Sequence, residues 1–220
     1  MARPRAASFD IQKALIQDAA ASLFASKGFH NASMSELAAV CEISKPLLYH
    51  YYRDKEEILL DICNSYADQL LTISQSDATD MEDGERRLRA LIMEFMKHYE
   101  HSRSRHIVLI QDVKFLSQEK REEVLDKHRF VINEFAKSVG KMYPQLDGTK
   151  LIKPITMLLF GMMNWTFTWM REDGPVTYEE IGQLATKFFI SGLKTLFEDE
   201  GSSPLTEDLS VVSLQHISIN

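Results

Sequence analysis

Residues 33–60, SMSELAAVCEISKPLLYHYYRDKEEILL, decide the fold class of this chain. Apolar side chains recur over residues 34–41 at the spacing of one helix face, and Ser33 stands before them where an N-cap is expected. After a tight connector, Ser44 is placed to cap a second helix over residues 45–52, whose proline falls in the first turn, where proline is tolerated. Two short helices joined by a tight turn predict a helix-turn-helix.

A longer helix is predicted on either side of this motif. The first runs from Asp10, carries an apolar face over residues 16–24 and ends at Gly28, because a glycine commonly follows the last residue of a helix. The other begins at Lys55 and continues to about Leu70. The motif therefore belongs to a larger helical head.

The outer face of residues 45–52 carries the side chains that could contact DNA. Leu48 and one of the two tyrosines 51 and 52 face inward at the helical spacing. The outer side is left with a cation, an apolar side chain, a phenol and an imidazole, namely Lys45, Leu47, Tyr49 and His50. Spacing alone leaves two interpretations open: a helix that enters a major groove, or a helical hairpin with a merely solvated outer face.

The rest of the chain continues as helices, so the sequence predicts an all-α fold. Polar residues 74–84 mark a loop. Five further helices are predicted over residues 88–99, 107–116, 117–139, 151–170 and 177–197. Cys41 and Cys63 lie among the apolar positions of helix patterns and are predicted to be small core residues.

The composition is that of an ordinary globular protein, with 45% hydrophobic and 26% charged residues. The net charge of −7 is uneven, because residues 1–55 carry seven basic and five acidic side chains, a net charge of +2. A basic head on an acidic body fits DNA contact at one end of the chain. The apolar run 155–169 is too short to span a membrane and the N-terminus lacks a signal-peptide stretch, so we expect a cytoplasmic location.

The sequence offers no recognisable catalytic or metal-binding pattern, and we expect neither enzyme activity nor a cofactor. It contains no Gly-rich phosphate loop and no nucleophile elbow around a serine. His98 and His101 are three residues apart but lack a third ligand on the same helix face.

The segment quoted above resembles the signature of TetR-family transcriptional regulators, and the likeness extends closely from Ile11 to about Asp68. The matching positions are Leu37, Ala38, Ser44, Lys45, Leu48, Tyr49, His50, Tyr51, Lys55 and Glu56, with conservative matches at Ile43 and Tyr52. The sequence departs from the signature at two places. Glu42 stands where the family has a turn glycine, so this glutamate would need a positive φ. Pro46-Leu47 stands where the family has Gly-Thr, and this apolar pair favours contact with thymine methyl groups.

The resemblance implies a three-helix DNA-binding domain over residues 8–68, with the helix-turn-helix at 33–52, and an effector-binding and dimerisation domain over 69–199. Residues 200–220 are expected to be a flexible tail. The implied protein is a homodimeric repressor that binds a palindromic operator on double-stranded DNA and is released by a small hydrophobic or acyl-CoA-type effector. Two alternatives remain, a metal or drug sensor on the same fold and a helical adaptor without sequence-specific DNA binding.

The resemblance also implies the residues of each site. Lys45 contacts bases, Lys55 contacts a phosphate, and Arg3 and Arg5 lie on a flexible arm before the first helix. The DNA-contacting set is Arg3, Arg5, Ser33, Ser44, Lys45, Pro46, Leu47, Tyr49, His50 and Lys55. The dimer interface is expected at Gly161, Phe188, Phe189, Leu193, Leu196 and Phe197. An effector pocket is expected at Met93, Met96, Tyr99, Arg103, Arg105, His106, Phe115, Met162, Trp165 and Trp169, although such a set is also typical of plain core.

Overall fold

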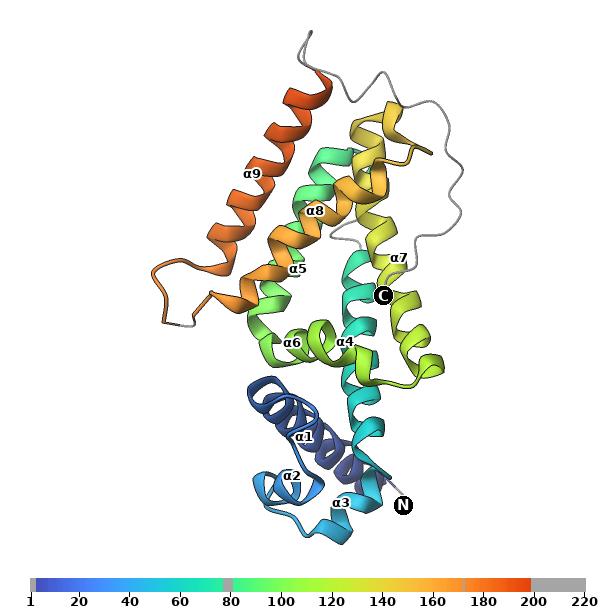
Figure 1. The fold of residues 1–220 in the computed structure, drawn as a ribbon, viewed down its shortest axis with the longest axis vertical. Coiled ribbons are helices and arrows are strands. Elements are labelled where there is room, and N and C mark those ends of the chain that lie inside the picture. Colours follow the sequence, from blue (N-terminus) through green and yellow to red (C-terminus); the bar gives the residue numbers. More distant parts are fainter. Residues whose placement is uncertain (1–2, 77–80, 172, 199–220) are drawn as a thin grey trace. The chain divides into compact units, whose positions relative to one another are not determined.

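The computed structural model describes residues 3–76, 81–171 and 173–198, with side chains from Phe9 onward. Over these ranges the chain consists of α-helices joined by turns and short 3-10 segments, without a strand (Figure 1). The predicted all-α fold is thus confirmed. The tail predicted at residues 200–220 lies outside the described residues. None of the described helices combines the length and the apolar character that crossing a bilayer requires.

The chain divides into two compact units. The first comprises the chain up to Leu71 together with Ser102–His128, and the second comprises Thr72–His101 and the chain from Arg129 onward. Two helices, α4 (Lys55–Ser74) and α7 (Gln118–Met142), therefore contribute residues to both units. The segment from Ser102 to His128, which follows the predicted domain boundary near residue 68, groups with the N-terminal helices.

The first unit is organised around α1 (Arg3–Lys27). This helix packs against α2 (Met34–Val40) and α6 (Arg103–Asp112), and α2 packs against α3 (Lys45–Tyr51). A 3-10 segment, η1 (Val113–Phe115), follows α6. The side chains that form the core of this unit are fully buried and apolar, among them Ile16, Phe24, Leu37, Leu48, Ile58 and Ile62.

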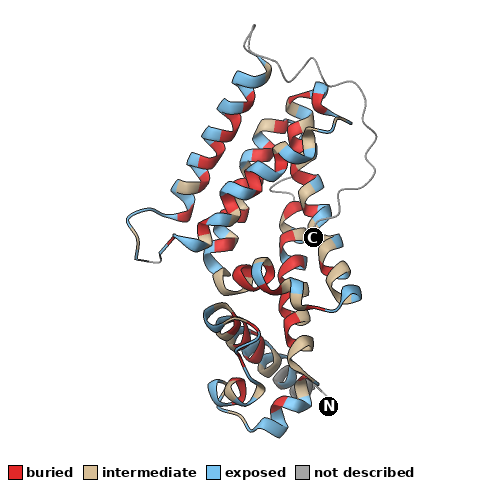
Figure 2. Cartoon of the chain, in the orientation of Figure 1, coloured by how far each residue is buried: buried red, intermediate tan, exposed pale blue. Residues whose placement is uncertain are grey.

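The second unit contains α5 (Gly84–His101), α8 (Ile152–Asn164) and α9 (Tyr178–Phe197), with 3-10 segments η2 (Pro144–Leu146) and η3 (Trp165–Thr168). The helix α9 packs against α5 and α8, and buried and exposed residues alternate along it (Figure 2).

Close contact between α9 and α5 depends on a glycine. A Cβ atom on Gly182 would lie 3.1 Å from the sulfur of Met93 and 3.2 Å from Cγ of Met96. The core of the unit also contains an aromatic cluster, with the Phe135 ring 4.9 Å from that of Phe95 and 4.8 Å from that of Phe160. The second unit is therefore held by tight apolar packing.

One buried ion pair interrupts the apolar core of the second unit. The guanidinium of Arg87 on α5 donates to Glu134 Oε2 at 2.6 Å and to Ser138 Oγ at 2.9 Å, both on α7. It also donates to the backbone carbonyl of Glu134 at 2.7 Å. Both charged side chains are only 10% exposed. These bonds fix α5 to α7 within this unit.

Three helices differ from their predicted limits in ways that bear on the predicted sites. The helix α1 begins at Arg3, so Pro4 lies in its first turn and the expectation of a flexible arm before the helix is wrong. The helix α6 begins at Arg103, so Ser102 alone separates it from α5. The helix α8 ends at Asn164 and tightens into η3, where the prediction extended an α-helix to residue 170.

Candidate nucleic-acid interface

Local sequence and two buried side chains hold α3 in place. The Ser44 hydroxyl accepts the backbone N–H of Leu47 at 3.3 Å, which caps the helix as predicted. Leu48 is 0% exposed and Tyr52 is 1% exposed, so these two residues face the core. The Tyr52 hydroxyl donates to the Asp61 carboxylate on α4 at 2.6 Å. The opposite side of α3 is thereby directed outward.

That outward side carries a compact set of chemically different groups. Lys45, Pro46 and His50 are exposed, and the side chains of Leu47 and Tyr49 are 41% and 45% exposed. A lysine and an imidazole can donate to base edges or phosphates, and Leu47 offers apolar contact. The structure therefore brings together the five α3 residues that the sequence predicted as DNA contacts.

The start of α2 offers a second polar group. The Ser33 hydroxyl oxygen accepts the N–H of Glu36 at 3.1 Å, and its own proton remains available to donate. Ser33 thus caps α2 as predicted, while the Glu36 carboxylate pairs with the ammonium of Lys27. The hydrogen bond from Lys27 holds the pKa of Glu36 below its usual value.

The turn between α2 and α3 contains a left-handed residue other than glycine. Glu42 has φ = +54°, as the missing family glycine led us to expect. Its N–H donates to the Ala39 carbonyl at 3.1 Å, and the N–H of Ile43 donates to the Ala38 carbonyl at 3.0 Å. These two bonds define a Schellman motif, in which glycine is the usual left-handed residue.

We expect Glu42→Gly to stabilise the protein by about 1 kcal/mol. The left-handed conformation costs a non-glycine residue roughly 1–2 kcal/mol, and the greater freedom of glycine in the unfolded chain offsets part of the gain from removing that cost. The midpoint of thermal unfolding should rise by roughly 2–4 °C for a chain of this length. Glu42→Ala is the control, since it removes the charge and keeps the backbone strain. An equal rise in both variants would assign the effect to charge alone.

Lys55, predicted to contact a DNA phosphate, is instead bound to backbone carbonyls of its own chain. Its ammonium donates to the carbonyls of Phe29 at 2.6 Å, His30 at 3.2 Å and Ala32 at 2.8 Å, and it lies 4.5 Å from the centre of the Phe29 ring. Burial lowers the pKa of Lys55. All three N–H groups are engaged, so none is left for a phosphate. Lys55 instead ties the start of α4 to the turn before α2.

Lys55→Met should therefore destabilise the protein by about 2 kcal/mol, since hydrogen bonds from a charged donor are lost to three carbonyls. The salt dependence of DNA binding should stay as in the wild type, because no phosphate contact is lost. Chemical unfolding and binding titrations at several salt concentrations measure the two effects. If the variant were as stable as the wild type and its DNA binding depended less on salt, Lys55 would be a phosphate contact after all.

Arg3 and Arg5 lie in the first turns of α1. Their side chains are outside the described part of the structure. A role in DNA contact for these two residues stays a prediction.

The ten predicted pocket residues are divided between the two units. Four lie in the first unit, where they pack or form polar contacts. Arg105 donates to Asp18 on α1 at 2.6 Å, the His106 ring lies 3.2 Å from the Tyr66 hydroxyl, and Phe115 stacks against Phe29 at 5.8 Å. The fourth, Arg103, begins α6.

The other six predicted pocket residues lie in the second unit. Met93 and Met96 pack at Gly182, and the Tyr99 hydroxyl donates to Asn164 Oδ1 at 2.8 Å. The remaining side chains are on the surface: Met162 is 37% exposed, Trp165 66% and Trp169 50%. A common effector pocket for these residues stays a prediction.

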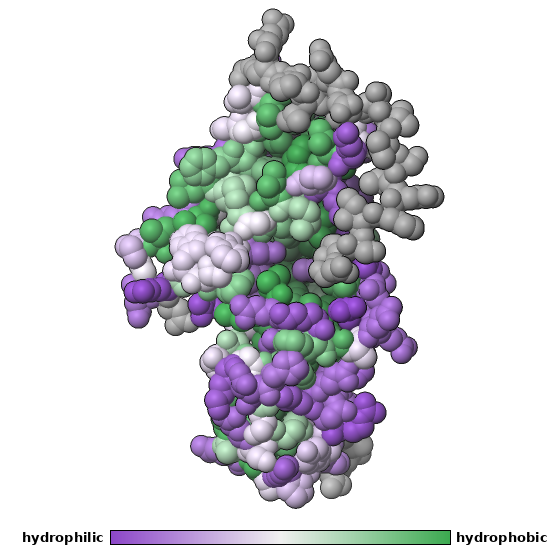
Figure 3. Space-filling model, in the orientation of Figure 1, coloured by the Kyte–Doolittle hydropathy of each residue, from purple (hydrophilic) through white to green (hydrophobic). Residues whose placement is uncertain are grey.

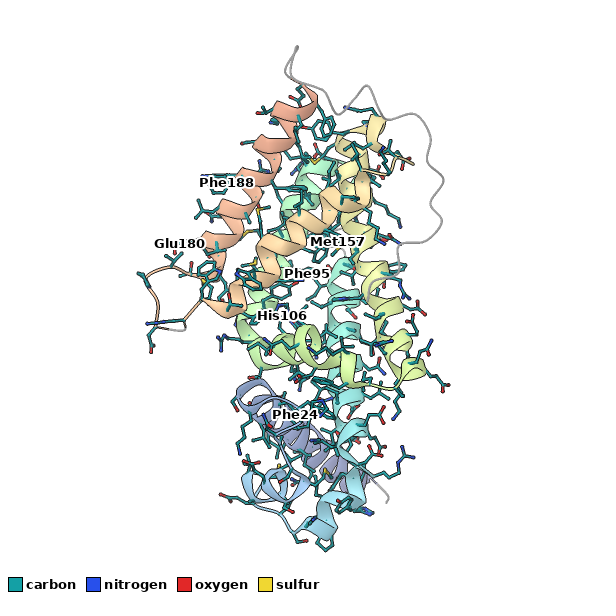
Figure 4. All side chains as sticks on the ribbon, in the orientation of Figure 1. Phe24, Phe95, His106, Met157, Glu180 and Phe188 are labelled. Carbon is teal, nitrogen blue, oxygen red and sulfur yellow. The ribbon has the colours of Figure 1, made fainter. Side chains whose placement is uncertain are left out.

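The predicted dimer residues also separate into two groups. Phe189 and Leu193 are 8% and 3% exposed, so they belong to the core of their own chain. Phe197 packs on Tyr143 at 5.4 Å. Phe188 is 71% exposed and projects away from the core of its unit (Figure 4), and Leu196 is 37% exposed. A side chain on Gly161 would meet open space.

The sequence prediction missed most of one apolar surface. Exposed apolar side chains on α8, on η3 and the residue after it, and on α9 form what we call the α8–α9 face: Met157, Leu158, Met162, Trp165, Trp169, Leu184, Phe188 and Leu196. Hydrophobic surface gathers over these helices in Figure 3. The four-residue spacing of Leu184 and Phe188 could have marked this face from the sequence.

The fold and the exposed α3 define a helix-turn-helix regulator of transcription. Residues 16–62 match the model of the bacterial regulatory proteins of the tetR family, and residues 81–193 match the model of the tetracyclin repressor-like C-terminal domain. The chain belongs to the TetR family of transcriptional regulators.

Several relatives show the extent of the likeness. The activator FasR of Mycolicibacterium smegmatis is 32% identical over 83 residues, which is 38% of each chain. The repressor KstR2 of Mycobacterium tuberculosis is 25% identical over 187 residues, covering 79% of this chain and 88% of KstR2. A TetR-family regulator from Bordetella parapertussis is 30% identical with a TM-score of 0.78, covering 84% of this chain and 97% of that structure. The structure of AibR, 24% identical, has a TM-score of 0.72 with 80% and 97% coverage.

Proposed function

We propose that this protein is a repressor that binds a palindromic operator as a homodimer and leaves the operator when a small hydrophobic or acyl-CoA-type effector binds. The observation that carries the DNA-binding part is the outer face of α3, where five exposed side chains are held in one orientation by two buried ones. A helix of this kind fits a major groove. No catalytic role is part of the proposal.

Each exposed residue of α3 has a role in the proposed complex. Lys45 donates to guanine O6 and N7, and Pro46 and Leu47 contact thymine methyl groups. Tyr49 and His50 donate to phosphates and fix the register of the helix. The hydroxyls of Ser33 and Ser44 add phosphate contacts at the starts of α2 and α3. Lys55 is left out of this set because its ammonium is fully engaged.

Lys45→Ala tests the base contact. We expect a loss of roughly 1–3 kcal/mol in specific binding and a relaxed preference at one base pair, because one bidentate contact disappears. The measurement is a set of titrations on the duplex that the wild type selects from a random pool and on single-base variants of it. Lys97→Ala, an exposed lysine of α5, is the matched control. Equal losses on all duplexes would make Lys45 a phosphate contact.

Homodimerisation follows from the same proposal. One helix-turn-helix contacts a half-site, and two must sit about 34–36 Å apart on the same side of the duplex. The α8–α9 face supports a second copy as its occupant, because it joins eight exposed apolar side chains on neighbouring elements. Surfaces of this kind are rare on monomers.

The effector and the repressor role rest on likeness to relatives. KstR2 is named a transcriptional repressor, and AibR was solved in complex with isovaleryl coenzyme A and operator DNA. In the proposed mechanism the effector favours a conformation in which α4 swings and carries α3 out of register. An effector shifts this equilibrium only as far as it prefers that conformation.

A thermal-shift screen against acyl-coenzyme A thioesters and hydrophobic drugs tests the effector class. A compound that binds the folded protein raises its unfolding temperature, and each such compound is then added to the protein–operator complex. We expect at least one stabilising compound to release the duplex. Stabilising compounds that leave DNA binding unchanged would count against the proposed coupling.

A further inference from the structure

Three aromatic rings meet at the end of α3, and one of them comes from α1. The Phe9 ring stacks on Tyr51 with 4.6 Å between centroids and 26° between planes. It meets His50 edge to face at 6.1 Å and 89°. His50 and Tyr51 are themselves in edge contact at 5.6 Å and 79°. Both geometries are favourable for aromatic pairs.

This contact exists because α1 begins before Asp10. A chain that became helical only at Asp10 would leave Phe9 in a connecting segment, whereas in the structure it is the seventh residue of a continuous helix. Phe9 remains 37% exposed, so it covers the neighbouring rings without being part of the buried core. Its neighbour Ile11 is 63% exposed.

His50 depends on these rings for its orientation. Among the described residues, the interactions that hold its side chain are the two aromatic contacts with Phe9 and Tyr51. Removing Phe9 would take away one contact and leave the other ring, Tyr51, without its stacking partner. A side chain that is already oriented loses less conformational freedom when it binds.

We propose that Phe9 is a positioning residue for DNA recognition, holding His50 directly and through Tyr51 in the orientation that meets the operator backbone. The proposal rests on the proposed function of α3. Aromatic pairs of this kind correspond to roughly 2- to 10-fold in an equilibrium constant. The effect should appear on the operator, where His50 sits in a fixed register, more than on unrelated DNA, which tolerates many registers.

The test compares five full-length variants with the wild type: Phe9→Ala, Phe9→Tyr, Ile11→Ala, His50→Ala and the double variant Phe9→Ala with His50→Ala. Phe9→Tyr keeps the ring, and Ile11→Ala removes an exposed apolar side chain from the same helix. Dissociation constants are measured on the duplex that the wild type selects from a random pool and on a scrambled duplex. The His50 ring-proton shifts and the unfolding temperature are recorded for each variant without DNA.

Phe9→Ala is expected to weaken binding to the selected duplex roughly 5- to 10-fold, with less than about 2-fold change on the scrambled duplex. Its His50 ring signals should move, whereas Phe9→Tyr and Ile11→Ala should bind as the wild type does. In the His50→Ala background, Phe9→Ala should cost little more, since there is no ring left to position.

Three results would overturn the inference while leaving the proposed function intact. In the first, Phe9→Ala binds the selected duplex as tightly as the wild type. In the second, Phe9→Ala loses equal affinity for both duplexes and unfolds at a lower temperature. In the third, Phe9→Ala weakens binding as much in the His50→Ala background as in the wild type. A wild-type protein that selects no duplex at all would instead overturn the proposed function, and the inference with it.

Discussion

Phe188→Glu should convert the protein to monomers and weaken operator binding roughly 100-fold or more, because linking two binding modules raises apparent affinity by about that factor. Phe188 is the most exposed large apolar side chain of the chain's described part, at 71%. It lies one helical turn from Leu184 on α9, within the α8–α9 face. The new carboxylate would be buried in an apolar interface without a partner, so the cost of burying its charge adds to the loss of the aromatic contact.

The control for this change is Phe130→Glu. Phe130 lies on α7, is 40% exposed and belongs to the same unit, but it is outside the α8–α9 face. Sedimentation equilibrium gives the mass of each variant, and titration on the selected duplex gives its affinity. A dimeric Phe188→Glu variant, or a Phe130→Glu variant that dissociates equally, would rule out the α8–α9 face as the interface.

Arg87→Leu should lower the free energy of unfolding by about 3–5 kcal/mol, which is the usual result of removing one partner of a buried ion pair. The change would leave the Glu134 carboxylate, 10% exposed, without the guanidinium that lies 2.6 Å away. It would also leave the Ser138 hydroxyl and the Glu134 carbonyl without their common donor. Lys137, 2.6 Å from the other carboxylate oxygen, offsets only part of this loss.

Two further variants separate this effect from charge in general. Arg89→Leu breaks an exposed pair with Glu85 on the same helix and should cost less than about 0.5 kcal/mol. Arg87→Leu combined with Glu134→Leu should recover most of the stability, because no uncompensated charge remains. Similar losses for Arg87→Leu and Arg89→Leu in urea unfolding would contradict the argument.

The Arg87 effect should also depend on pH. Burial opposes ionisation of Glu134, but hydrogen bonds from Lys137 and Arg87 hold its pKa below the usual value. A lowered pKa stabilises the folded state above the unfolded-state pKa of about 4.3, and this stabilisation disappears as the pH falls through the folded-state value. The difference between the wild type and Arg87→Leu should therefore be full at neutral pH and shrink below about pH 4.

The helix-turn-helix could be predicted because its signals are local. Ser33, Ser44, Pro46 and Gly28 each act on backbone groups within a few residues, so their caps and turns follow from sequence order alone. The same holds for Glu42, whose position in the turn requires a left-handed residue whatever lies around it.

The failures came from contacts between distant residues. Lys55 meets carbonyls 23 to 26 residues earlier in the chain, so its pattern resembles a phosphate contact until the fold closes around it. The prediction also extended the helix of α8 to residue 170. In the structure α8 ends at Asn164, which accepts a hydrogen bond from Tyr99, 65 residues earlier in the chain. On α9, the neighbouring rings of Phe188 and Phe189 are both predicted at the dimer interface, but α9 packs on α5 and α8 so that Phe189 is buried and Phe188 is exposed.

The left-handed turn at Glu42 has a genetic consequence. Both glutamate codons become glycine codons by one A-to-G change in the second position, so the residue that suits this backbone is a single mutational step away. That step would relieve the φ of +54° and remove an exposed carboxylate next to α3 at the same time. In a mutant library screened for heat tolerance or for tighter repression, codon 42 is where the first gains are expected.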